Sequence, residues 1–143
     1  MAKRKWRIRK DPLFRGDHRD SVCVPVPTAS PSIVRHVMYL EGPGRETPYL
    51  STSEQSDVAE RFGQHGGVWS TSVPHASANG VLHISNSTLL GLMKGDGKGD
   101  AKWPNAFEVM QARRYVEEHS EHLLDFRQVD DPQTVVRRIF TKS

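Results

Sequence analysis

The order of hydrophobic and polar positions along the chain predicts short strands interspersed with short helices. Alternating or continuous apolar positions predict strands at 33–40, 49–53, 68–73, 81–85, 121–129 and 134–140. Helical spacing and capping residues predict helices at 54–62, 86–93 and 105–120. Apolar side chains would occupy both faces of the first strand, which is typical of a central strand. Because strands and helices do not alternate regularly, the pattern favours an α+β fold over a doubly wound parallel sheet.

Three consecutive hydroxyl residues, Ser51, Thr52 and Ser53, stand between a predicted strand and a predicted helix. Glu54 follows Ser51 by three positions, which is the spacing of a capping box. Gln55 follows Thr52 at the same capping-box spacing. One cap needs only one such pair, so the stretch holds more hydroxyl groups than the start of a helix requires.

The length of 143 residues is suited to one domain with one modest core. We divide the chain into a basic, proline-containing N-terminal arm at 1–30 and a single domain at 31–143. Six of the first ten residues are Lys or Arg, and such a segment can contact phosphates, anionic lipid or an acidic protein surface. One function class that this arm suggests is a non-enzymatic nucleic-acid-binding module, with Trp6 as a stacking residue.

Several features bear on the compartment in which the protein acts. No apolar run approaches the ~20 residues that a membrane-spanning helix needs. The basic start is not followed by the apolar core of a signal peptide, so we expect no Sec-type export. Cys23 is the only cysteine, which excludes an internal disulfide and a zinc site built on several thiolates. These features fit a reducing compartment.

Common catalytic and metal-binding motifs are missing from the sequence. His119, Glu121 and His122 form the densest cluster of potential metal ligands, but the HExxH spacing is missing and we expect no metal. No G-x-S-x-G motif occurs, and Cys23 lies among prolines, so neither a serine nor a cysteine hydrolase is favoured. The glycine-rich stretch 94–104 lacks the Walker A spacing and is predicted to be a loop.

Three segments, in order along the chain, carry a resemblance to a known family. "IVRHV" (33–37) is similar to a first-strand arginine motif, and "YLSTSEQSDVAERF" (49–62) is similar to a serine-threonine-serine motif that leads into a helix. "YVEEHSEHLLDFRQVDDPQTVVRRIF" (115–140) resembles the segment around a catalytic glutamate. The sequence therefore resembles ADP-ribosyltransferases of the arginine-serine-glutamate class, the cholera and pertussis toxin-like group.

The resemblance implies a fold and a set of catalytic roles. It implies two small, mainly antiparallel sheets that form an NAD cleft, with short helices beside them. Glu121 would stabilise the positive charge that develops on the ribose when the nicotinamide bond breaks. Ser51 would help to hold Glu121, and Arg35 would offer a planar, charged donor fork to the phosphates of NAD. His36 competes with Arg35 for the first-strand role, because a related class has histidine there.

The resemblance also bears on binding residues and substrates. It assigns NAD binding to Arg35, His36, Ser51, Thr52, Ser53 and Phe62. NAD would be a substrate, and no metal would be required. The second substrate would be a macromolecule, with a protein favoured over a nucleic acid, and His119 occupies the position that selects it. Arginine-modifying members have glutamate at that position, so arginine is not supported as the acceptor, while cysteine, asparagine, nucleic acid and a small molecule remain open. The predicted protein is a mono-ADP-ribosyltransferase, a toxin or effector that acts in the cytoplasm or in the cytosol of a target cell.

Overall fold

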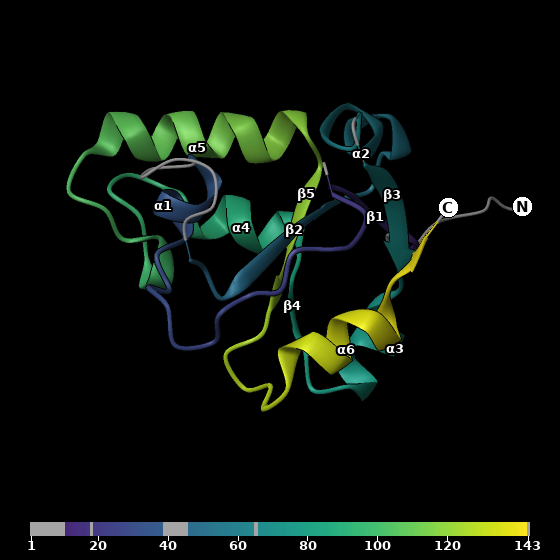
Figure 1. Cartoon of the computed structure of the whole chain (residues 1–143). Coiled ribbons are helices and arrows are strands. Elements are labelled where there is room, and N and C mark those ends of the chain that lie inside the picture. Colours follow the sequence, from purple (N-terminus) through teal and green to yellow (C-terminus); the bar gives the residue numbers. More distant parts are fainter. Residues whose placement is uncertain (1–10, 18, 39–45, 65, 143) are drawn as a thin grey trace, which may run out of the picture.

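A six-stranded antiparallel sheet forms the centre of the fold (Figure 1). The structure is a computed structural model, and it describes residues 11–17, 19–38, 46–64 and 66–142. The strand order is β4-β5-β2-β1-β3-β6. The strands are β1 (Leu13–Asp17), β2 (Tyr49–Ser53), β3 (Gly67–Thr71), β4 (Leu82–Ile84), β5 (Glu121–Asp125) and β6 (Thr141–Lys142). The expected α+β class is confirmed.

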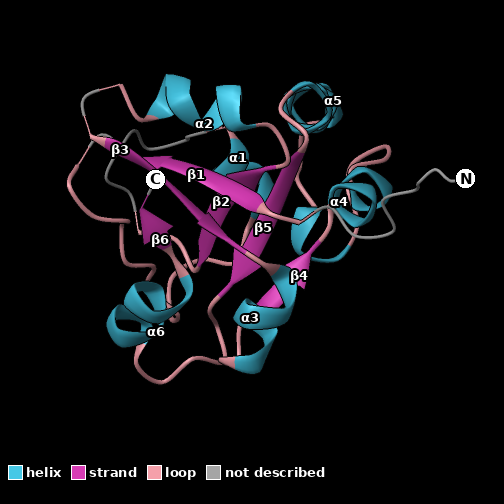
Figure 2. Ribbon diagram, turned by 90° about the vertical axis from the view of Figure 1, so that its right-hand side faces the viewer, coloured by secondary structure: helices cyan, strands magenta, loops and turns pink. Residues whose placement is uncertain are grey.

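Helices cover both sides of this sheet, with α2 and α5 on one side and α3 and α6 on the other (Figure 2). The helices are α1 (Ile33–Val37), α2 (Ser56–Phe62), α3 (Val73–Ala78), α4 (Asn86–Leu92), α5 (Ala106–Glu118) and α6 (Pro132–Ile139), with a 3₁₀ turn at Gly99–Ala101. The predicted cap of α5 is present, since the Asn105 side chain accepts from two backbone N–H groups. None of the helices within the described ranges is long and apolar enough to cross a membrane.

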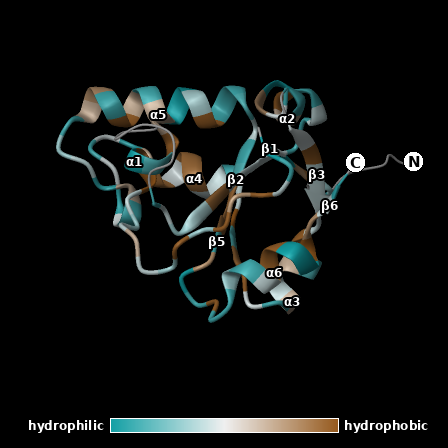
Figure 3. Cartoon of the chain, in the orientation of Figure 1, coloured by the Kyte–Doolittle hydropathy of each residue, from teal (hydrophilic) through white to brown (hydrophobic). Residues whose placement is uncertain are grey.

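Two hydrophobic cores lie on opposite faces of the sheet. Successive strand residues point to opposite faces, so Tyr49 and Leu123 join the core under α1, α4 and α5. Leu50 and Leu124 join the core under α3 and α6. Hydrophobic and hydrophilic positions alternate along α5, whose apolar side faces the first of these cores (Figure 3). Strands β2 and β5 are therefore buried on both faces.

The prediction of two separate sheets is wrong, because one pair of residues joins the two halves. Strands β4, β5 and β2 form one half, and β1, β3 and β6 form the other. Between the halves, the register of β1 with β2 consists of Phe14 opposite Ser53 alone. By comparison, β1 pairs with β3 over all of its residues. The sheet can therefore open between β1 and β2 while remaining continuous.

Two predicted strands are helices in the structure. Segment 33–40 begins with α1, where Ser32 accepts from the Arg35 N–H as an N-cap; residues 39 and 40 lie outside the described ranges. Segment 134–140 lies mostly in α6, which starts with an Asp131 cap and a proline in its first turn. In both cases the buried residues recur at helical spacing, and packing on one face favours the helix.

Elements that the sequence pattern did not predict include α3, β1 and β6. Residues 74–80, between two predicted strands, contain most of α3, which Ser72 caps. Residues assigned to the arm at 1–30 include β1, which pairs with both β2 and β3. Residues 11–17 thus belong to the sheet, while the basic residues 1–10 and Trp6 lie outside the described part of the chain.

The close approach of α2 to β1 depends on Gly16. A Cβ atom at Gly16 would collide with the backbone carbonyl oxygen of Ala59 in α2. We predict that Gly16→Ala lowers the free energy of unfolding by about 1–3 kcal/mol, because overpacking displaces the helix. Urea denaturation measures this change.

Gly91→Ala is the matched control for this substitution. Gly91 lies in α4, and a Cβ there meets no atom within 4 Å. The control should raise the free energy of unfolding by about 0.5–1 kcal/mol, because alanine loses less chain entropy than glycine in a helix. Unchanged stability of Gly16→Ala would contradict the tight contact between α2 and β1.

Candidate functional site

A cavity of about 530 Å³ opens between β1 and β2, beyond their single paired position. Residues from both strands line it, together with parts of α1, α2, the end of α5 and the start of β5. Five of the predicted NAD-binding residues are among them, namely His36, Ser51, Thr52, Ser53 and Phe62. Glu121 and His119 also line it. The structure therefore gathers most of the predicted site residues into one pocket.

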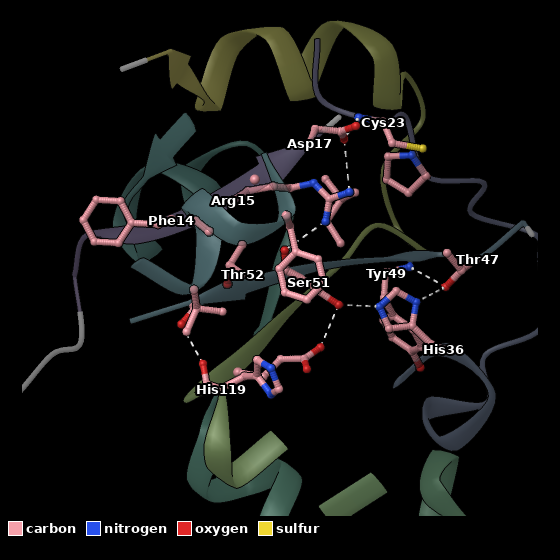
Figure 4. A pocket seen from close by; sticks show the side chains of 18 of the residues that line it. Phe14, Arg15, Asp17, Cys23, His36, Thr47, Tyr49, Ser51, Thr52 and His119 are labelled. Carbon is pink, nitrogen blue, oxygen red and sulfur yellow. Dashed lines mark hydrogen bonds and ion pairs between the residues drawn. The ribbon is translucent and has the colours of Figure 1, made fainter. Parts of the chain in front are cut away.

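Ser51 and Glu121 are in direct contact, although 70 positions separate them. The Ser51 hydroxyl donates to Glu121 Oε2 at 2.7 Å. Ser51 lies in β2, and Glu121 begins the adjacent β5 with only 3 % of its surface exposed. On its other side, the Ser51 oxygen is 2.7 Å from His36 Nε2 (Figure 4). Hydrogen bonds thus hold the carboxylate in one orientation inside the pocket.

His36 extends this chain of hydrogen bonds to Thr47, whose hydroxyl oxygen is 2.7 Å from Nδ1. Since the Ser51 hydrogen is donated to Glu121, the Ser51 oxygen accepts from His36 Nε2–H. In the neutral ring, Nδ1 then accepts from the Thr47 hydroxyl. Tyr49 packs edge-on against the ring, with centroids 5.5 Å apart. Burial raises the pKa of Tyr49, whose hydroxyl therefore stays protonated as a donor.

Thr52 and Ser53 fix the backbone on both sides of the glutamate. Ser53 Oγ donates to the His119 carbonyl at 2.6 Å. Thr52 Oγ1 donates to the His122 carbonyl at 3.0 Å. Between these positions Ser120 has φ of 46°, in the left-handed region that residues other than glycine seldom adopt. The expected capping boxes are absent, because Ser51 and Thr52 lie within β2 and Gln55 precedes α2 without a side-chain cap.

Arg15 is the pocket's partly buried cation, and the sequence analysis missed it. Its Nη1 donates to the Ser51 carbonyl at 2.9 Å, and its Nη2 is 3.2 Å from Asp17 Oδ2. Its Nε is buried without a hydrogen-bond partner among the described residues. Asp17 also accepts from the Cys23 N–H at 2.9 Å, which ties the following segment to the same site. The guanidinium is thus oriented by two partners while donors remain for a ligand.

Arg35 does not occupy the position that the sequence analysis assigned to it. It lies in α1 rather than in a strand, and its Nη1 donates to the Glu46 carbonyl at 3.0 Å. Among the described residues that line the cavity, Arg15 and the exposed Arg19 are present and Arg35 is not. The neighbouring His36 does line the cavity, because adjacent residues of a helix point about 100° apart.

Aromatic side chains line the side of the pocket near His119. The His119 ring stacks on the Tyr115 ring, with centroids 4.0 Å apart. The centroid of the Phe62 ring lies 6.1 Å from that of His119. In the view of Figure 4, Asp17 and Cys23 lie at the top of the pocket and His119 lies at the bottom, with Arg15 and Ser51 between them. The pocket therefore has a cationic end and an aromatic end.

A sequence signal for the cationic end does exist. Arg15 and Asp17 are two positions apart, so a strand places them on one face, where opposite charges can pair. The prolines that follow favour an irregular arm, so the pattern did not predict this short strand. Tyr115 carries a similar signal, since it precedes His119 by one helical turn.

The wider similarity of the chain gives no further guide to the site. No protein-family model matches the chain, and no curated protein and no solved structure is significantly similar to it. The chemistry of the pocket therefore has to be inferred from its own side chains.

A second polar cluster lies on the opposite face of the sheet from Glu121. His122 is buried, with Nε2 2.6 Å from Glu54 Oε2 and Nδ1 2.7 Å from His83 Nε2. The two imidazole rings stack with centroids 5.0 Å apart. Side chains alternate between the two faces along β5. His122 therefore lies on the other face of the sheet from the pocket that Glu121 and His119 line. Within the described ranges, no three His, Cys, Asp or Glu side chains are grouped as ligands for one metal ion.

We expect His83 in this cluster to make the free energy of unfolding depend on pH. Burial, and secondly the neighbouring His122, lower the pKa of His83, although the charge of Asp11 opposes them. A lowered pKa in the folded state means that the unfolded chain binds more protons in acid. We therefore predict that the free energy of unfolding falls as the pH drops below about 6.5, the ordinary pKa of histidine, and levels off below the folded-state pKa.

Chemical denaturation at a series of pH values measures this dependence. His83→Gln keeps a donor for His122 and removes the titrating group, so its stability should change less between about pH 7 and pH 5. His75→Gln, at an exposed histidine, is the control and should retain the wild-type dependence. An identical pH dependence in His83→Gln and the wild type would show that another group is responsible.

Proposed function

We propose that this protein is an NAD-dependent mono-ADP-ribosyltransferase, which breaks the bond between nicotinamide and ribose and transfers ADP-ribose to a macromolecular acceptor. One observation carries this proposal. A buried carboxylate, Glu121, is held by the Ser51 hydroxyl at 2.7 Å in a cavity that also contains the Arg15 guanidinium. The proposal combines this geometry with the resemblance of the sequence motifs.

Glu121 supplies what the bond-breaking step requires. As the C–N bond breaks, its electron pair moves to the nicotinamide ring and positive charge develops on the ribose. A carboxylate fixed beside the ribose stabilises that charge more than water does, because it needs no reorientation during the reaction. Ser51 and His36 fix the carboxylate, and their hydroxyl and imidazole act as positioning groups.

Arg15 takes the phosphate-binding role that the sequence analysis gave to Arg35. Its guanidinium is held by the Ser51 carbonyl and by Asp17, which engage two of its five N–H groups, and Arg15 lines the cavity. A phosphate oxygen is a suitable acceptor for the remaining N–H groups. Arg19 adds a second cation on the cavity lining. The volume of about 530 Å³ lies within the range of ligand pockets, about 300–1,000 Å³.

The proposed biological role is that of a toxin or effector acting in the cytosol, with a protein as the acceptor. The cavity opens between two strands, and Phe62 at its aromatic end is 41 % exposed. An exposed aromatic side chain beside a reactive centre can contact a second, large substrate. No metal takes part in the proposed reaction, because the fixed carboxylate provides the charge stabilisation.

One substitution separates catalysis from NAD binding. We predict that Glu121→Gln lowers nicotinamide release at least about a hundredfold, because the amide carries no charge to stabilise the ribose. The amide oxygen can still accept from Ser51, so NAD should still raise the thermal unfolding temperature. Nicotinamide release is measured by chromatography, and binding by thermal unfolding with and without NAD.

Arg15→Lys and Arg35→Lys form the matched pair for the phosphate role. Arg15→Lys should lose most of the stabilisation by NAD, because an ammonium group lacks the planar fork. Arg35→Lys should keep it. If NAD neither protects the wild type nor yields nicotinamide with any protein lysate, the proposed function is wrong.

A further inference from the structure

We propose that His119 is the general base for the transfer step, and that the acceptor is a neutral S–H or O–H group. This inference rests on the function proposed above, because it names the second substrate of the same site. It follows from the hydrogen bonding of the His119 ring, from the surroundings of that ring and from the charge balance of the reaction.

The hydrogen bonding of His119 fixes which ring nitrogen is free. Nδ1 lies 2.8 Å from the Tyr115 carbonyl oxygen. A carbonyl can only accept, so Nδ1 carries the hydrogen and the neutral ring has its lone pair on Nε2. Among the described residues, Nε2 has no hydrogen-bond partner. The ring therefore offers one unoccupied acceptor nitrogen in the lining of the pocket.

The surroundings of His119 hold the ring in place on the pocket lining that also includes Glu121. Stacking on Tyr115, with planes 24° apart, limits rotation of the ring. The Ser53 hydroxyl fixes the His119 carbonyl at 2.6 Å. In the strand register, Ser53 is also the residue opposite Glu121. Ser53 thus contacts the backbone at His119 and is paired with Glu121, and both of these residues line the pocket.

The transfer step places a proton on this nitrogen. A lone pair of the acceptor sulfur or oxygen forms the new bond to the ribose carbon, while the C–N pair leaves with nicotinamide. The S–H or O–H proton moves to His119 Nε2, so the positive charge of the pyridinium ring ends on the imidazole. Glu121, on the same pocket lining, is a carboxylate of opposite sign. Atoms and charges balance without another reactant.

A guanidinium acceptor does not fit this arrangement. A protonated guanidinium has no lone pair for attack, and its pKa is above about 12. A neutral imidazole is too weak a base to deprotonate it. A thiol, with an ordinary pKa of about 8.5, transfers its proton to imidazole readily, and a hydroxyl does so as the new bond forms.

The experiment uses the full chain, NAD and three small acceptors. These are N-acetylcysteine amide for the thiol, N-acetylserine amide for the hydroxyl, and agmatine for the guanidinium. Adducts are quantified by mass spectrometry and nicotinamide by chromatography. We expect adducts with the thiol or the alcohol, and none with agmatine. Water is itself an O–H acceptor, so NAD hydrolysis gives the same information if no adduct forms.

Variants at His119 test the role of the base directly. His119→Gln should slow transfer or hydrolysis about a hundredfold or more, the usual contribution of a general base, while NAD still raises the unfolding temperature. His75→Gln, at an exposed histidine, should behave as the wild type.

The outcomes distinguish the two proposals. Wild-type turnover by His119→Gln, or an agmatine adduct formed by the wild type as fast as the thiol and alcohol adducts, overturns the role of His119 and leaves the proposed transferase intact. Absence of both NAD protection and nicotinamide release in the wild type overturns the transferase, and the inference with it.

Discussion

The pairing of β2 with β5 is the constraint on which the rest of the structure depends. Their five registered pairs run from Tyr49 opposite Asp125 to Ser53 opposite Glu121. Both strands are buried on both faces, so a shift of one residue would turn every core side chain to the wrong face. The register that packs the two cores is the same register that brings Ser51 to Glu121.

This arrangement also explains how one sheet supports two different polar clusters. On one face, the chain of hydrogen bonds from His36 to Glu121 faces a cavity. On the other, His122 is enclosed and linked to Glu54 and His83. Adjacent residues of β5 therefore have unrelated environments, and the first cluster lines a cavity with room for a ligand.

The cavity itself results from incomplete pairing. A sheet whose strands all pair fully leaves no space between neighbours, whereas β1 and β2 share one pair and then separate. Arg15 contacts the Ser51 carbonyl across this opening, and Asp17 orients it. The Ser51 carbonyl is thus satisfied by a side chain rather than by a backbone N–H of β1.

The sequence by itself determined the elements with strong local signals. The β2 strand at 49–53 and the long helix capped by Asn105 follow from periodicity and capping, which act within a few residues. The motif pattern also pointed to Ser51 and Glu121, which the structure brings together. Short apolar segments such as 33–37 and 134–140 were mistaken for strands, because their local pattern suits either structure.

Tertiary packing determines that those segments are helices. It also determines which arginine lines the pocket. One face of α1, with Ile33, Val34 and Val37, packs into a core. That core forms only when α5 and β2 are in place. Arg35 then lies away from the cavity, and Arg15 lies within it because β1 is inserted beside β2. Arg15, rather than Arg35, shares the cavity lining with Glu121 because of contacts between residues far apart in the sequence. Local preferences do not encode such contacts.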